Sequence, residues 1–170
     1  MADQPLNPVP NCLDLEQQPA TPLLPNANSI RVYNSGGQLA VINSSGSSAL
    51  PSTTRSLQFL INGEGSTPGT GVFAQISVPY SCTVKGWVIT ADQSGSAVVD
   101  ILRASYANFP TTASIAGTDK PTLSSAQKNE DLTLSGWGST AINAGDILQA
   151  NLNSVTTVTQ VFVTVNVTVP

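Results

Sequence analysis

Histidine is absent from this chain of 170 residues, and charged residues make up only 9% of it. An average soluble domain carries roughly 25% charged residues, so Ser, Thr, Asn and Gln must solvate most of this surface. Without an imidazole there is no histidine base for a nucleophilic triad and no histidine ligand for a metal. The six basic residues are scattered from Arg31 to Lys128, whereas nucleic-acid binding needs them clustered. We therefore expect a protein that is not an enzyme, holds no cofactor or metal and binds no nucleic acid.

Long apolar runs are also missing. No stretch approaches the ~20 apolar residues of a membrane helix. The first residues, Met1 to Pro5, have neither the basic nor the apolar region of a signal peptide. We expect a protein that is made in a cytoplasm, is not exported by the usual route and has no membrane contact.

Cysteine occurs only twice, as Cys12 and Cys82. A metal site needs clustered thiolates, which this spacing does not provide. We expect two free thiols with Cys82 buried, and the alternative is a Cys12–Cys82 disulfide.

The residues that are abundant favour strands. Hydrophobic residues make up 40% of the chain, and β-branched residues and turn formers outnumber the good helix formers. We predict an all-β protein whose main domain is an antiparallel, jelly-roll-like β-sandwich.

The segment Pro79–Arg103 is expected to lie at the core. Two apolar, β-branched runs, Thr83–Ala91 and Ala97–Leu102, flank the polar cluster Asp92–Ser96, in which Gly95 tolerates a positive φ. This arrangement predicts a hairpin with a loop of about four or five residues. Both runs are apolar on both faces, which indicates that both faces are covered.

The clearest strand is Thr159–Val169, in which every second residue from Val161 is valine. This period of two predicts one face buried in the core. The opposite face, with Thr164 at its centre, lies against either water or another subunit.

Further elements follow from local patterns. A capping-box pattern at Ser124–Gln127 predicts a single turn of helix. The expected strands are Ser29–Tyr33 and Gln38–Ile42 as a small hairpin, then Ser56–Ile61, Val72–Val78, Asp131–Ser135 and Ile147–Leu152.

Residues 1–28 contain half of the chain's 12 prolines. Proline removes a backbone donor and fixes φ, so neither a helix nor a central strand runs through this segment. We predict an extended arm that attaches to a partner, with a disordered tail as the alternative. The domains expected are the arm at 1–28, a hairpin and linker at 29–54 and the sandwich at 55–170. The apolar anchors of the arm are Leu6, Val9, Leu13, Leu15 and Leu23.

Candidate sites in the main domain are few. The glycine-rich segment Gly63–Gly71 lacks the lysine and the following helix of a phosphate loop. The adjacent carboxylates Glu130 and Asp131 point in opposite directions in an extended chain, so we expect a solvated edge. Tyr106 and Trp137, both expected in loops, are the aromatic residues proposed to contact a ligand such as a glycan.

Several segments together resemble a module of tailed-bacteriophage virion proteins. They are ISVPYSCTVKGW at 76–87, ADQSGSA at 91–97, YANFP at 106–110, KPTLS at 120–124 and AGDIL at 144–148. The resemblance spans about residues 56–169, and the hairpin at 31–42 is similar to segments upstream of such modules. It implies a β-sandwich, a homotrimer and a location in the virion, in proteins described as fibres, spikes or head decorations. The N-terminal arm is not part of it.

These observations favour a non-enzymatic virion protein that decorates or cements the capsid, bound through its arm to other virion proteins, with the major capsid protein as the expected partner. The alternative is a short tail fibre or spike that binds host-surface glycans.

Overall fold

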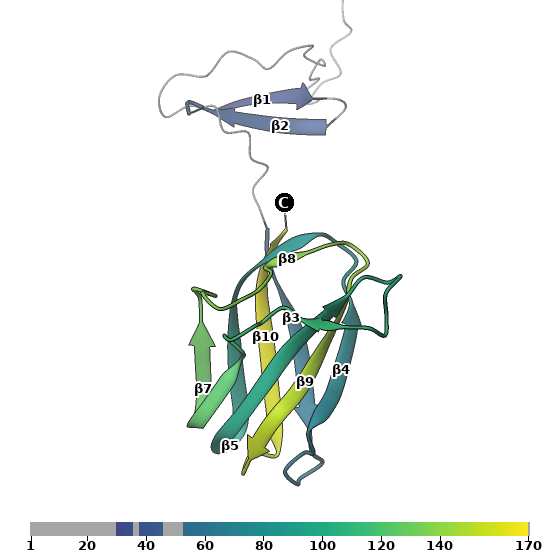
Figure 1. The fold of residues 1–170 in the computed structure, drawn as a ribbon. Helices are drawn as coiled ribbons and strands as arrows, with labels where there is room; N and C mark the ends of the chain where they lie inside the picture. The colour runs from purple at the N-terminus through teal and green to yellow at the C-terminus, as the bar shows by residue number, and fades with distance from the viewer. Residues whose placement is uncertain (1–29, 36–37, 46–52, 170) are drawn as a thin grey trace, which may run out of the picture. The chain divides into compact units, whose positions relative to one another are not determined.

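The computed structural model describes residues 30–35, 38–45 and 53–169 (Figure 1). The chain divides after Pro51 into two units. Every regular element of the described residues is a β-strand, and all the strand pairs are antiparallel. This confirms the predicted antiparallel, sandwich-like all-β fold. The proposed arm at 1–28, with its anchors Leu6, Val9, Leu13, Leu15 and Leu23, lies outside the described residues.

The first unit contains the predicted small hairpin. Strands β1 (Ile30–Ser35) and β2 (Gln38–Asn43) pair antiparallel, from Ile30 opposite Asn43 to Ser35 opposite Gln38.

The second unit is one rolled sheet in the order β3-β10-β5-β9-β4. The short strands β6 and β8 and the longer β7 also pair with β5, so β5 contacts most of the unit. The strands are β3 (Thr53–Asn62), β4 (Gly71–Ser77), β5 (Cys82–Ala104), β6 (Ala113–Ser114), β7 (Thr122–Asp131), β8 (Ala141–Ile142), β9 (Ile147–Thr156) and β10 (Gln160–Val169).

Strand β5 corrects the predicted central hairpin. Its two apolar halves do not pair with each other: the first half pairs with β10 up to Ala91, and the second half pairs with β9 from Ser96 onward. The chain bends between these halves, at the predicted polar cluster. Gly95 is needed there for space, because a Cβ at this residue would lie 2.6 Å from the Thr156 carbonyl oxygen. The bend therefore carries β5 from one layer of the sandwich to the other.

Strand β7 corrects two local predictions. It follows both halves of β5, with Leu123 opposite Ala97 and Lys128 opposite Thr90. The predicted helical turn at Ser124–Gln127 is therefore wrong, because pairing with β5 outweighs the capping-box pattern. The predicted strand Asp131–Ser135 is also wrong beyond its first residue, since β7 ends at Asp131.

The core lies between the two layers. Strand β10 shows the predicted alternation: its valines from Val161 to Val167 are fully buried, and Phe162 on the opposite face is exposed. The first half of β5 adds Trp87 and Ile89 to this layer. The facing layer contributes Val99, Ile101, Leu148, Ala150 and Leu152.

Candidate functional site

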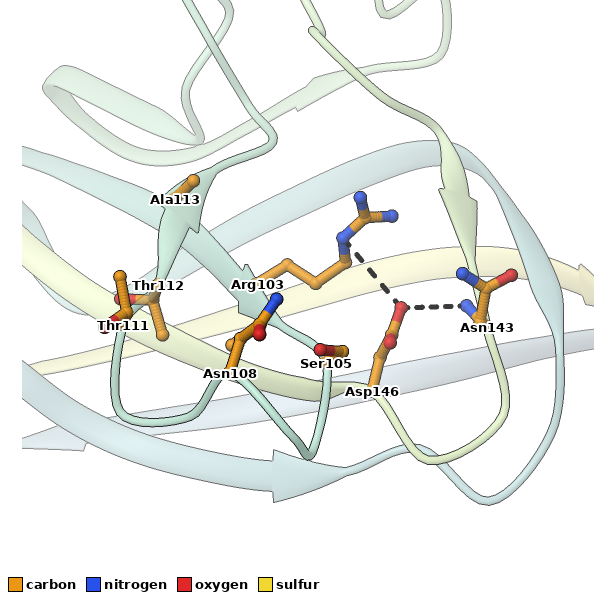
Figure 2. A pocket seen from close by; sticks show the side chains of 9 residues that line it. Arg103, Ser105, Asn108, Thr111, Thr112, Ala113, Asn143 and Asp146 are labelled. Carbon is orange, nitrogen blue, oxygen red and sulfur yellow. Dashed lines mark hydrogen bonds and ion pairs between the residues drawn. The ribbon is translucent and has the colours of Figure 1, made fainter.

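A polar pocket of about 300 Å³ lies where β5 ends (Figure 2). Arg103, at the end of β5, forms one side of it. The loop that leads from β5 to β6 supplies Ser105, Asn108, Thr111 and Thr112, and the turn before β9 supplies Asn143 and Asp146.

The turn at 143–146 is held in one geometry. The Asn143 backbone N–H donates to Asp146 Oδ2 at 2.9 Å, so the aspartate closes its own turn. Gly145 has a φ of 87°, which glycine adopts without strain. Gly145 N–H donates to the Val78 carbonyl at 2.7 Å, and Val78 N–H donates to the Asp146 carbonyl at 2.9 Å. This turn is thereby fastened to the segment between β4 and β5.

The loop at 105–112 also has internal hydrogen bonds. The N–H groups of Asn108 and Phe109 both donate to the Ser105 carbonyl at 3.1 Å. Thr111 N–H donates to the Asn108 carbonyl at 2.9 Å. The loop therefore presents its side chains from a hydrogen-bonded backbone.

Arg103 and Asp146 form the charged part of the pocket. Arg103 Nε lies 3.9 Å from Asp146 Oδ2, and the two side chains are 28% and 7% exposed. The Arg103 guanidinium also donates to the Ala141 carbonyl. Among the described residues that line the pocket, only the arginine and the aspartate are charged, and their formal charges cancel.

Cys82 is buried and is a free thiol in the structure, as predicted, and not part of the alternative disulfide. Burial raises its pKa, and the negative charge of Asp146 raises it further. The thiol is therefore protonated and unreactive in the folded protein. Cys12 lies outside the described residues.

The two aromatic residues predicted to contact a ligand have different environments. Tyr106 belongs to the pocket loop and is 81% exposed. Trp137 packs against the core, and its indole N–H donates to the Asp119 carbonyl at 2.9 Å. Neither residue lines the pocket itself. Sequence reasoning missed Arg103, Asn143 and Asp146, for which the Ala144-Gly145-Asp146 turn pattern was the only local signal.

A second polar cluster joins Asp119 to Asp131 at the end of β7. Burial and the neighbouring Asp131 carboxyl raise the pKa of Asp119. The hydroxyl and backbone N–H of Thr133 lower the pKa of Asp131 to about 2. Trp87 lies close enough to Asp119 to offset a part of this rise in its pKa. Within the part of the chain that the structure describes, the buried atoms Trp87 Nε1 and Asp119 Oδ2 form no hydrogen bond. The chain after β7 is joined to the loop at 116–119 by hydrogen bonds from Thr118 N–H to the Gly136 carbonyl and from the Trp137 indole to the Asp119 carbonyl.

Residues 30–35, 38–45 and 53–169 contain no group of three or more His, Cys, Asp and Glu side chains placed to hold a metal ion. They also form no helix long and apolar enough to cross a membrane.

Comparisons with protein-family models, curated proteins and solved structures found no match to this chain.

Proposed function

We propose that this chain is a non-enzymatic structural protein of a phage virion that decorates or cements the capsid. The observation that carries the proposal is the division of the chain after Pro51, which separates the proline-rich segment from a sandwich with its own core. The resemblance of residues 56–169 to virion modules supports the virion as the location.

Among the described residues, the main buried cluster of the sandwich unit lies between Leu57 and Val167. The proposed role of the leucines in the N-terminal segment is to cover a partner's surface. Proline restricts the segment before binding, so less conformational entropy is lost when it docks.

A homotrimer is part of this proposal. Leu60 on β3 lies directly opposite Phe162 on β10. Both side chains are on the outer face of the sheet, 45% and 48% exposed. An adjacent pair of large apolar side chains on an otherwise polar face is a suitable contact for a second copy.

The test uses particles that lack this protein. Full-length protein should bind them, and a variant that lacks residues 1–28 should not, while the thermal transition of the sandwich stays nearly unchanged. Electron cryomicroscopy of the decorated particle should then place the protein on the head shell. Binding by the shortened variant would contradict attachment through the arm.

A short tail fibre or spike that binds host-surface glycans is the second candidate. Tyr106, which is 81% exposed in the loop that lines the polar pocket, favours it. If electron cryomicroscopy places the protein on the tail of the particle instead of the head, this second candidate is favoured over the first.

A further inference from the structure

We infer that the pocket formed by Arg103, the loop at 105–112 and the turn at 143–146 binds one unit of a neutral saccharide. This inference deepens the glycan-binding candidate function and rests on it. It concerns which residues bind the sugar and which chemical class of sugar they accept.

Uncharged hydrogen-bonding side chains line much of the pocket. The side chains of Ser105, Asn108, Thr111, Thr112 and Asn143 line the pocket and make no hydrogen bond within the described part of the chain. Amides and hydroxyls can both donate and accept. The hydroxyl groups of a sugar have the same dual character, so such a lining can pair with them in either direction.

The paired charges of the pocket favour a neutral ligand. An anionic ligand would favour a pocket with uncompensated positive charge, but the guanidinium of Arg103 lies 3.9 Å from the carboxylate of Asp146. Arg103 and Asp146 both line the pocket, with side chains 28% and 7% exposed. A charged donor and a charged acceptor both form stronger hydrogen bonds than neutral groups do. The pocket can therefore bind hydroxyls strongly without selecting a negative charge.

The backbone that surrounds the pocket is preorganised by hydrogen bonds. The turn at 143–146 is fastened to Val78 by two backbone hydrogen bonds, and the loop at 105–112 is closed by three. A ligand that binds between them orders little additional backbone, which lowers the entropic cost of binding. The pocket's volume of about 300 Å³ is at the small end of ligand sites, which run from ~300 to 1,000 Å³. This size suits a single sugar unit better than a long segment of chain.

The experiment applies purified full-length protein to an array of neutral oligosaccharides of hexoses and N-acetylhexosamines, with sialylated, sulfated and phosphorylated counterparts. The pocket variant is Asn108→Ala/Asn143→Ala. The matched control is Thr67→Ala/Thr70→Ala, which removes two exposed side chains from the loop between β3 and β4, at the opposite end of the sandwich (Figure 1). Because neither asparagine side chain has a partner in the described residues, we expect all three proteins to share one thermal transition.

The expected result is binding of the wild type and the control to a neutral oligosaccharide, and binding by the pocket variant weakened by about tenfold or more. Equal binding by all three proteins would overturn the pocket assignment and leave the glycan-binding candidate intact. Binding only to charged glycans would overturn the choice of a neutral sugar. Absence of wild-type binding to any glycan would remove the candidate function itself. If the asparagine variant does not fold, Thr111→Val/Thr112→Val tests the same pocket with the same expected weakening.

Discussion

The carboxylate of Asp92 accepts hydrogen bonds from both the backbone N–H and the hydroxyl of Thr159, at 3.0 and 2.6 Å. It also accepts a bond from the Gln160 N–H at 2.9 Å. Asp92 lies at the bend of β5, and Thr159 lies in the turn between β9 and β10. This one side chain therefore joins the point where β5 changes layer to the point where the chain passes from β9 to β10.

We expect Asp92→Asn to destabilise the sandwich at neutral pH, because an amide has one acceptor oxygen in place of two. The measurement is the urea midpoint of unfolding. Glu130→Gln is the control, since Glu130 is an exposed carboxylate without a hydrogen bond in the described residues. An unchanged midpoint for Asp92→Asn would show that the bend is held by other contacts.

The contribution of the Asp92 carboxylate to stability should depend on pH. The Thr159 hydroxyl, followed by the Gln160 N–H, lowers the pKa of Asp92 below its usual value. A depressed pKa stabilises the fold above the unfolded pKa, and this contribution is lost as the pH falls through the folded pKa. The difference in midpoint between wild type and Asp92→Asn should therefore be full at pH 7 and shrink as the pH falls below ~4. A constant difference across this range would contradict the assigned role of the charge.

The contribution of Asp119 to stability should depend on pH in the opposite direction. Its pKa is raised by burial and by the Asp131 carboxyl, so ionisation of Asp119 opposes folding, and stability is lost as the pH rises through its folded pKa. We expect Asp119→Asn to be more stable than wild type at pH 7, with the difference disappearing at low pH. Thermal unfolding at several pH values measures this. A variant less stable than wild type at pH 7 would show that the carboxylate is needed in its charged form.

The two faces of β10 should respond differently to a charge. Val165 is fully buried between Leu57 and Trp87 of the neighbouring strands. Burying one valine contributes about 1.5–3 kcal/mol, so Val165→Ala should destabilise measurably. Val165→Asp should prevent folding, because it buries an unpaired carboxylate. Equal tolerance of Val165→Asp and Thr164→Asp would contradict the assignment of the faces.

Thr164→Asp also tests the proposed trimer, because Thr164 shares its face with Phe162 and Leu60. We expect this variant to fold and to sediment as a monomer, and Leu60→Ser/Phe162→Ser to do the same. Wild-type protein that sediments as a monomer at micromolar concentration, with no trimer on the particle, would contradict the proposed assembly.

Trp137 and Tyr106 should contribute differently to the unfolding free energy. Trp137→Phe removes the indole N–H that bonds the Asp119 carbonyl, which should cost about 1 kcal/mol of unfolding free energy. Tyr106→Ala should leave the unfolding free energy unchanged, since the side chain is mostly exposed. Chemical denaturation measures both. Equal destabilisation would show that the Tyr106 ring packs more closely than its exposure indicates.

The residues of β10 show how much local sequence can determine. Alternation of valine with polar residues predicts a strand and its buried face, because successive side chains of any strand point to opposite sides. The small hairpin of β1 and β2 was predicted for a similar reason, since its strands are close in sequence and its turn residues lie between them. In both cases the information lies within one short, continuous segment of the chain.

The two halves of β5 show where this reasoning fails. The polar cluster around Gly95 correctly separates two apolar runs, but such an interruption fits both a hairpin and a bend between layers, and β5 continues through it as one strand. The choice depends on whether β9 and β10 compete for the edges of the two halves, and these strands lie more than 40 residues later. The capping box at Ser124–Gln127 failed for the same reason, because a distant strand paired with a segment whose local preference was helical.

The sequence by itself determined the fold class, the small hairpin and the buried face of β10, since composition and period-two patterns act through the backbone geometry of each segment. The tertiary structure alone decided the pocket. Arg103 pairs with Leu148 in the β5–β9 register, and this pairing brings the guanidinium beside Asp146, 43 positions later in the sequence. No local pattern joins these two residues, because their proximity arises from the register of two strands and from the turn that Asp146 closes.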